Sequence, residues 1–174
     1  MRLFHDLFYG TRPKEEQNMA IEQVKAYLKG YGLANRIREF EESSATVELA
    51  AHAVGVEPAR IAKSLSFKKE DHALIIVVAG DARIDNRKYK DTFGMKAKML
   101  TAEEVEAYTG HQIGGVCPFA NPESAEVYLD DSMKRFETVY PAAGSANSAV
   151  KLSLEELMQC SRAKGWVDVC KDLA

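Results

Sequence analysis

The sequence predicts a mixed α/β fold in which helices flank a mixed β-sheet or open barrel. Three observations lead to this prediction: apolar residues recur at helical spacing in Glu15–Gly30, β-branched residues fill Ala73–Val78, and the later strand-like and helix-like segments alternate irregularly. A doubly wound parallel sheet would require regular alternation, so the irregular order argues against one. The 174 residues contain no repeat or linker, which predicts a single domain over residues 1–174.

Two helices and a short strand are predicted for the first third of the chain. They are Glu15–Gly30, the strand Arg36–Phe40, and a helix that Ser43 and Ser44 cap and that runs through Val54. Gly55 closes that helix, because glycine adopts left-handed backbone angles without a steric penalty. Residues 1–35 form an N-terminal helical extension in this prediction.

Two adjacent strands are predicted at the centre of the sheet. Lys63–Phe67 alternates in character, and Ala73–Val78 is the kind of apolar run that is buried on both faces of a sheet. The polar residues 68–72 between them suit a hairpin.

Short helices and strands are predicted for the second half of the chain. The expected helices are Asp85–Phe93, Thr101–Tyr108 and Ser153–Gln159, and the expected strands are Val127–Leu129, Thr138–Tyr140 and Ala149–Leu152. Thr101 and Glu104 have the capping-box spacing that opens a helix. Residues 160–174 are predicted to form a C-terminal helical tail.

The charge distribution suggests one basic region. Between Arg60 and Lys98 there are ten Lys or Arg against five Asp or Glu, a local charge of +5 that leaves −8 elsewhere and a net charge of −3. Such a face could meet an RNA phosphate backbone, or it could be an ordinary solvated surface. The net charge argues against a strongly basic nucleic-acid coat, and we expect no DNA partner.

Composition also bounds the compartment and the cofactors. The longest apolar run, Ala73–Gly80, is too short to cross a bilayer, and Met1–Gly10 lacks the continuous apolar core of a signal peptide. We therefore expect a cytoplasmic protein with no membrane partner. The three cysteines and four histidines show no metal-finger spacing, so neither a metal nor a disulfide framework is expected.

A glycine-rich loop, residues 114–119, lies between a predicted helix and a predicted strand. Gly114 and Gly115 carry no Cβ, so backbone N–H groups there can approach a ligand closely, and Pro118 stiffens the exit. By itself this hexapeptide favours a plain turn over a binding loop, because most Gly-Gly loops are only turns.

The order of three landmarks resembles a known family. Lys63-Ser64-Leu65 opens a strand, Ile113-Gly-Gly-Val-Cys-Pro118 follows, and Gly144-Ser145 precedes Val150-Lys-Leu-Ser153. From about Ile37 to Leu157 the chain resembles the YbaK/prolyl-tRNA-synthetase-associated domain family, whose members deacylate mischarged aminoacyl-tRNA.

The resemblance implies a YbaK-like mixed sheet or open barrel with a pocket for the aminoacyl group at the tRNA 3′ end. The family lysine falls on Lys63, its Gly-x-x-x-Pro loop on Gly114 and Pro118, and a later pocket glycine on Gly144. It also implies a free-standing trans-editing hydrolase that needs no cofactor and removes a small amino acid from tRNA(Pro). The implied partners are the 3′ acceptor end of aminoacyl-tRNA and an aminoacyl-tRNA synthetase that presents it.

Ester hydrolysis passes through a tetrahedral oxyanion, which backbone N–H groups of Gly114, Gly115 and Val116 could stabilise. Lys63 could hold the terminal phosphate or ribose, or it could orient water. We favour the first role, because a lysine must lose much of its basicity before it acts as a base. The predicted substrate-binding residues are Phe40, Thr46, Leu65, Cys117, Pro118, Phe119, Gly144 and Ser145.

Departures from the cysteinyl-tRNA branch of the family leave the amino acid open. That branch has tyrosine where Phe40 stands, aspartate where Ala149 stands and commonly serine where Cys117 stands. We therefore carry over no cysteinyl specificity, and alanine, serine, threonine or a small non-protein amino acid are all candidates.

Two other functions compete with metal-free deacylation at Lys63. Cys117 would be a nucleophile if its thiolate were stabilised and a base such as His111 lay beside it, but cysteines are more often small buried apolar residues. Alternatively, the chain is a non-catalytic module that binds aminoacyl-tRNA or a synthetase, since a fold does not establish an activity.

Overall fold

The computed structural model describes residues 14–173, so the predictions made for Met1–Gly10 lie outside the described residues. The helices are α2 (Lys14–Lys29), α3 (Val47–Val54), α4 (Asn86–Phe93), α5 (Ala102–Thr109) and α6 (Leu154–Ser161), with 3-10 turns at Ala34–Arg36, Pro58–Arg60 and Asp131–Arg135. The strands are β1 (Ile37–Glu39), β2 (Ile61–Lys69), β3 (His72–Ala79), β4 (Glu126–Asp130), β5 (Thr138–Pro141), β6 (Ser148–Val150), β7 (Leu152–Ser153) and β8 (Trp166–Val167).

A six-stranded mixed sheet with the order β7-β5-β2-β3-β4-β8 forms the centre of the fold. The hairpin of β2 and β3 is antiparallel, whereas β4 runs parallel to β3 and β5 parallel to β2. A two-stranded sheet of β1 and β6 lies beside it. The sheet curls into a half-barrel flanked by helices, so the predicted mixed α/β class is confirmed.

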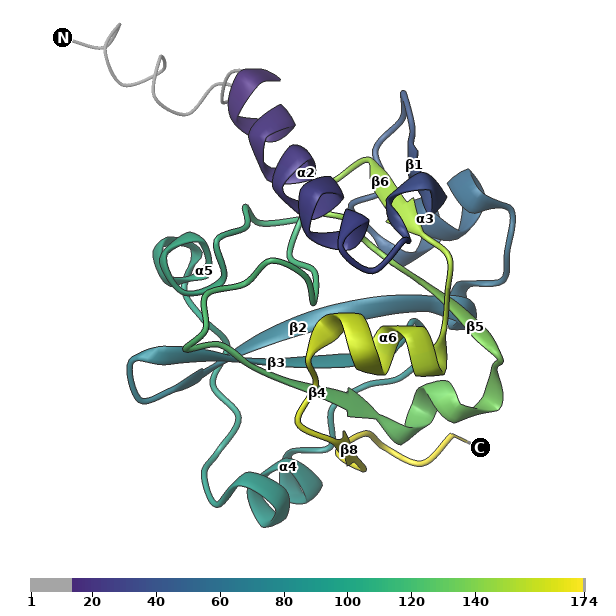
Figure 1. Ribbon diagram of the computed structural model, residues 1–174. Coiled ribbons are helices and arrows are strands. Elements are labelled where there is room, and N and C mark those ends of the chain that lie inside the picture. The colour runs from purple at the N-terminus through teal and green to yellow at the C-terminus, as the bar shows by residue number, and fades with distance from the viewer. Residues whose placement is uncertain (1–13, 174) are drawn as a thin grey trace, which may run out of the picture.

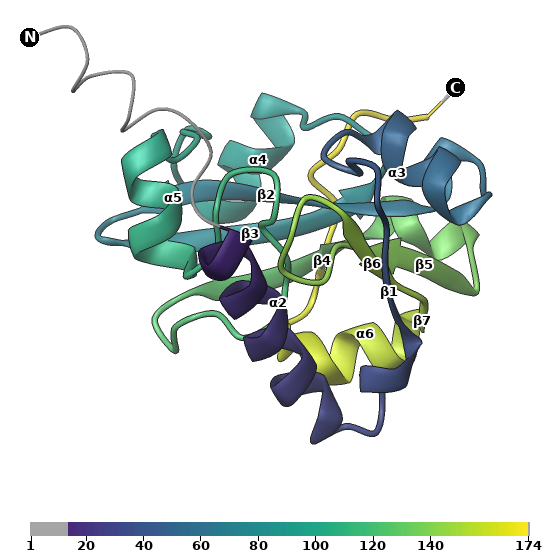
Figure 2. The same ribbon diagram turned by 90° about the horizontal axis from the view of Figure 1, so that it is seen from above.

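Helices cover both faces of the central hairpin. In Figures 1 and 2, α2 and α6 lie on one side of β2 and β3, and α4 lies on the other. Residues 73–79 of β3 have no exposed surface, which agrees with the predicted burial on both faces. On the α4 side, the Phe67 ring packs against Tyr89, with ring centroids 5.0 Å apart.

Most predicted elements are present, but three details were wrong. The cap of α3 is Thr46, whose side chain accepts a hydrogen bond from the Leu49 N–H, whereas the Ser44 N–H donates to the Ala146 carbonyl. The strand predicted over 149–152 is split at the exposed Lys151, because β6 pairs with β1 and β7 pairs with β5.

The predicted C-terminal helical tail is the third error. Arg162 takes left-handed angles and ends α6, after which Trp166 and Val167 pair with the outer edge of β4. The Val169 N–H then donates to the Asp130 carboxylate at 2.9 Å. An available strand edge therefore determines the conformation of this segment, and local helix propensity does not.

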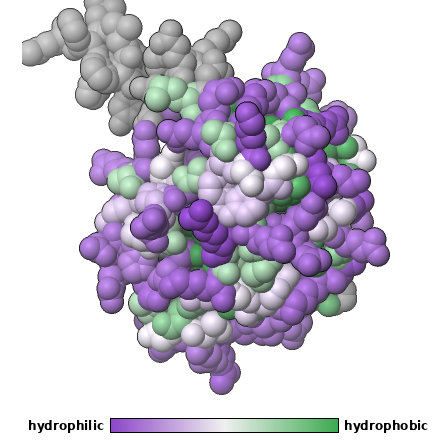
Figure 3. All heavy atoms as spheres, in the orientation of Figure 1, coloured by the Kyte–Doolittle hydropathy of each residue, from purple (hydrophilic) through white to green (hydrophobic). Residues whose placement is uncertain are grey.

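The surface is mainly hydrophilic on the face shown in Figure 3, with small apolar patches between the hydrophilic residues. No helix among residues 14–173 is long and apolar enough to cross a membrane. Part of the basic region is neutralised internally: Lys68 pairs with Glu104, Lys69 with Glu126, and Lys88 with Asp168 and Asp172. The surface available to a polyanion is therefore smaller than the sequence count indicates.

Candidate active site

A cavity of about 450 Å³ opens at the free edge of β2. Its walls come from the start of α3, from residues 61–66 of β2, from residues 99–105 leading into α5, and from residues 113–116. Ala142 and the strand β6 close the remaining side. The lining is mainly apolar and, within residues 14–173, contains no histidine, aspartate or glutamate.

The cavity brings together five of the predicted site residues. Thr46, Lys63, Leu65, Gly114 and Val116 line it, although they come from three separate parts of the chain. The other seven predicted residues do not line it: Phe40, Gly115, Cys117, Pro118, Phe119, Gly144 and Ser145.

Among the described residues, Lys63 is the one cation in the cavity lining. It is partly buried, and this burial lowers the pKa of its ammonium below the usual 10.5, an effect to which Arg83 adds and which Asp81 and Glu48 oppose. Its Nζ donates a long hydrogen bond of 3.5 Å to the Gly80 carbonyl. Among residues 14–173 no carboxylate lies within salt-bridge distance of this ammonium, so its charge is available to an anionic ligand.

The glycine-rich loop presents two backbone donors and uses a third internally. The Gly115 N–H donates to the Gln112 carbonyl at 2.9 Å, so it is already engaged. The N–H groups of Gly114 and Val116 have no hydrogen-bond partner within the described part of the chain. Gly114 has a φ of 86°, which favours glycine. The loop can therefore direct two N–H groups at a ligand.

Gly115 and Gly144 allow two loops to touch. A Cβ on Gly115 would lie 3.1 Å from the Gly144 carbonyl oxygen, so the two backbones are in close contact there. Gly144 has a φ of 99°, and a Cβ on it would lie 2.9 Å from the Ala20 carbonyl oxygen in α2. These glycines support the cavity wall from behind.

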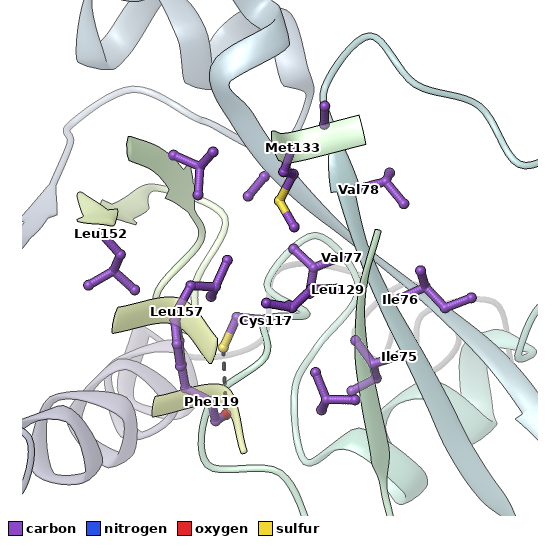
Figure 4. Close-up of a cluster of buried hydrophobic side chains, with 14 of the residues drawn as sticks. Ile75, Ile76, Val77, Val78, Cys117, Phe119, Leu129, Met133, Leu152 and Leu157 are labelled. Atoms are coloured by element: carbon purple, nitrogen blue, oxygen red, sulfur yellow. Dashed lines mark hydrogen bonds between the residues drawn. The ribbon is translucent and has the colours of Figure 1, made fainter. Parts of the chain in front are cut away.

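Cys117 belongs to the hydrophobic core. It is fully buried, and Figure 4 shows its sulfur inside the cluster with Leu157 and Phe119. Burial raises the pKa of its thiol to about 12. Its Sγ lies 3.4 Å from His111 Nε2, but that nitrogen also lies 2.7 Å from the Phe119 carbonyl oxygen, and burial lowers the pKa of His111. Both groups are held neutral, which disfavours a thiolate nucleophile.

Replacing Cys117 with alanine is expected to leave the rate of any hydrolysis within about twofold and to lower the free energy of unfolding by roughly 1–2 kcal/mol, because a small core side chain is truncated. The melting temperature and kcat/KM of purified wild-type and variant protein measure the two effects. A variant that folds normally but has lost all activity would reinstate the thiol.

Asn147 organises the remaining predicted residues outside the cavity. Its side-chain amide donates to the Phe40 carbonyl, and its side-chain oxygen accepts from the Ser145 hydroxyl, each at 2.8 Å. The Phe40 ring lies beneath the Arg38 guanidinium instead of pointing into the cavity. Phe40 and Ser145 therefore hold the β1–β6 end of the site together.

Sequence reasoning missed the small residues of the lining and several of its hydroxyl groups. Ala45, Ala50 and Ala142 line the cavity, and alanine in a helix or loop gives no local signal for such a role. The buried Ser64 hydroxyl also lines it and has no hydrogen-bond partner in the part of the chain that the structure describes.

The fold and the cavity define an α/β domain with a mostly apolar cavity whose lining includes Lys63. The chain belongs to the aminoacyl-tRNA editing domain family, whose model matches residues 41–160. The resemblance seen in the sequence is thereby confirmed.

Three relatives place the chain within this family. It is 54% identical to "Uncharacterized protein YwhH" of Bacillus subtilis, covering 88% of this chain and 99% of that protein. It is 24% identical to "Putative Cys-tRNA(Pro)/Cys-tRNA(Cys) deacylase EbsC" of Enterococcus faecalis, covering 88% and 92%. The structure titled "Crystal structure of a putative trans-editing enzyme for prolyl tRNA synthetase" aligns with a TM-score of 0.80 and 29% identity, covering 94% of this chain and 100% of that one. The family and these relatives support an editing or deacylase function on aminoacyl-tRNA.

Proposed function

We propose that this protein is a free-standing trans-editing hydrolase that removes a small amino acid from mischarged tRNA(Pro). The observation that carries the proposal is the apolar cavity at the β2 edge, whose lining includes Lys63, Gly114 and Val116. Within the described part of the chain, no carboxylate pairs with Lys63 and no group accepts from the two loop N–H groups. This rests on the family as well as on the geometry. The acceptor end of aminoacyl-tRNA is the partner, with a synthetase as the protein that hands it over.

The proposed chemistry is hydrolysis of the ester between the amino acid and the terminal ribose. Water adds to the ester carbonyl carbon, the negative charge that develops on the carbonyl oxygen is stabilised by backbone N–H donors, and the bond to the ribose oxygen breaks. Lys63 holds an anionic or hydroxyl group of the terminal nucleotide. Because the described lining offers no carboxylate or imidazole, the proton of the attacking water leaves to solvent or to a group of the substrate, and the departing ribose oxygen takes up a proton from solvent to become the hydroxyl.

The size of the lining residues supports a small amino-acid side chain. Ala50, Ala142 and Ala149 bound the cavity, and Ala149 offers no polar group where the cysteinyl branch has a carboxylate. A single methyl group in an apolar pocket is worth only about 1–3 kcal/mol, so discrimination by size is modest. Alanine, serine and threonine are the proposed substrates to test first.

A panel of tRNAs tests this function directly. tRNA(Pro) charged in turn with Ala, Ser, Cys, Thr and Pro is incubated with the protein, and release of each amino acid is measured. We expect hydrolysis of at least one small amino acid and protection of Pro-tRNA(Pro). Binding to several of them without hydrolysis would favour the alternative, a non-catalytic module that keeps the fold.

A further inference from the structure

As far as the described residues show, the outer edge of β2 is open at one residue. Along its inner edge β2 pairs with β3 from Ala62 to Lys69. Along its outer edge, β5 pairs only with Ile61 and Ala62, and residues 98–100 bond only near its other end. There the Leu100 N–H donates to the Ser66 carbonyl at 3.2 Å. Ser64 lies between these two covered stretches.

The register shows where the backbone of Ser64 points. Lys69 pairs with His72 across a two-residue turn, so the closing pair is hydrogen-bonded and every second pair before it is not. The pair of Ser64 with Val77 belongs to the second kind. Its N–H and C=O therefore point away from β3, as do the Ser66 carbonyl and the Lys68 N–H, which bond to residues 98–100.

The side chain of Ser64 adds a second, independent observation. Its Oγ is buried and has no hydrogen-bond partner among residues 14–173, and the residue lines the cavity. Buried hydroxyls are usually hydrogen-bonded, so an unpartnered one in an apolar cavity marks a place where a polar ligand group belongs. One residue of the cavity lining thus carries an outward-facing backbone donor and acceptor as well as an unpartnered hydroxyl.

The width of the opening limits what can bind there. Four residue steps separate Ala62 from Ser66, which is roughly 13 Å of strand. Only Ser64 faces outward between the two covered ends, so an added peptide strand has no room to form a ladder. A group the size of a single amino acid, carrying one donor and one acceptor, fits this edge.

We propose that Ser64 binds the aminoacyl group of the substrate as a one-residue β-bridge. The α-ammonium donates to the Ser64 carbonyl, and the ester carbonyl accepts from the Ser64 N–H, which is how paired residues in an antiparallel ladder exchange hydrogen bonds. This inference rests on the proposed function and adds to it a requirement for a free α-amino group. The N–H also becomes one of the donors to the oxyanion, beside Gly114 and Val116.

A proline substitution tests the backbone donor. Ser64→Pro removes an N–H that does not bond to β3, and proline is tolerated where a strand N–H faces outward. Its expected effect is a 10- to 100-fold weaker affinity with a melting temperature close to that of wild type. Ser64→Ala keeps both backbone groups and should weaken binding only severalfold. Leu65→Pro is the matched control, because Leu65 forms a hydrogen-bonded pair with Ile76, and its loss should unfold the sheet.

Isothermal calorimetry measures the dissociation constant of 3′-(L-alanylamino)-3′-deoxyadenosine. This analogue of the substrate is not hydrolysed, because an amide replaces the ester. Its N-acetylated form, which lacks the ammonium, should bind wild-type protein at least tenfold more weakly. Equal binding of both forms, or unchanged binding by Ser64→Pro, overturns the inference, and so does failure of wild type to bind. Hydrolysis of the tRNA panel is measured separately from binding of the analogue. The binding mode at Ser64 can therefore be disproved while the proposed deacylase function stands, and the deacylase function can be disproved by the panel alone.

Discussion

Replacing Lys63 with alanine is expected to lower kcat/KM for deacylation by about 10- to 100-fold, since a charge-assisted hydrogen bond is worth about 1.5–3 kcal/mol. If the ammonium binds the terminal nucleotide equally strongly in the ground and transition states, the fall in kcat/KM appears as a higher KM with kcat unchanged. Steady-state kinetics on charged tRNA separate the two constants. Lys68→Ala, on the same strand but paired with Glu104 outside the proposed chemistry, is the control.

The pH dependence distinguishes the two possible roles of Lys63. Burial lowers its pKa, so its charge is lost at a lower pH than that of an ordinary lysine. If the charged form holds the substrate, activity falls as pH rises through that lowered pKa, whereas a lysine base would make activity rise there.

The same burial penalises the charged form of Lys63 in the folded state. Lys63→Met should therefore raise the free energy of unfolding at neutral pH while lowering the deacylase activity. Wild-type values of kcat and KM for the Lys63→Ala variant would contradict any role for Lys63 in substrate binding or catalysis.

The second large effect is expected at Gly144. Gly144→Ala should lower the free energy of unfolding by about 3 kcal/mol, because a side chain is strained at a φ of 99° and its Cβ would meet the Ala20 carbonyl oxygen and Val24. For a chain of this size that corresponds to roughly 6–12 °C in Tm. Deacylation should also fall, since the Gly144 backbone supports Gly115 from behind.

Gly32→Ala is the matched control for Gly144. Gly32 has a φ of 74°, yet a Cβ there meets nothing within 4 Å, so only the backbone cost of about 1–2 kcal/mol applies. Thermal unfolding of both variants isolates the contact with α2. Equal losses of unfolding free energy at the two positions would mean that the Cβ added at Gly144 costs nothing beyond the backbone strain, which would contradict a tight contact between α2 and this loop.

The fold could be predicted from the sequence wherever the signal was local. The β-branched run of β3, the capping box of α5 and the glycines after α3, α4 and α5 each impose their structure through nearby atoms. The tail after Cys160 could not be predicted in this way, because the edge of β4 that it joins lies more than thirty residues earlier in the chain.

The site was predicted in outline and not in detail for the same reason. Lys63 and Gly114 were found because their order along the chain resembles a family, and both line the cavity. The same motifs also identified Gly115, Cys117 and Gly144, but these residues pack outside the cavity lining. Which residues of a loop face a cavity depends on φ angles and long-range packing, as the engaged Gly115 N–H shows. The orphaned Ser64 hydroxyl is visible only once the outer edge of β2 is known to be open.

The contact of α2 with the Gly144 loop bears on where the folding unit begins. The family match starts at residue 41, yet Ala20 and Val24 of α2 pack on Gly144, and β1 supplies the partner strand of β6. A chain cut at residue 41 would leave β6 with an unpaired edge. It would also remove the α2 residues that pack on Gly144, whose backbone in turn contacts Gly115 in the glycine-rich loop. The first helix and strand are thus structural parts of the editing domain, and a shortened version would lose the rigidity of its substrate wall before it lost any residue of that wall.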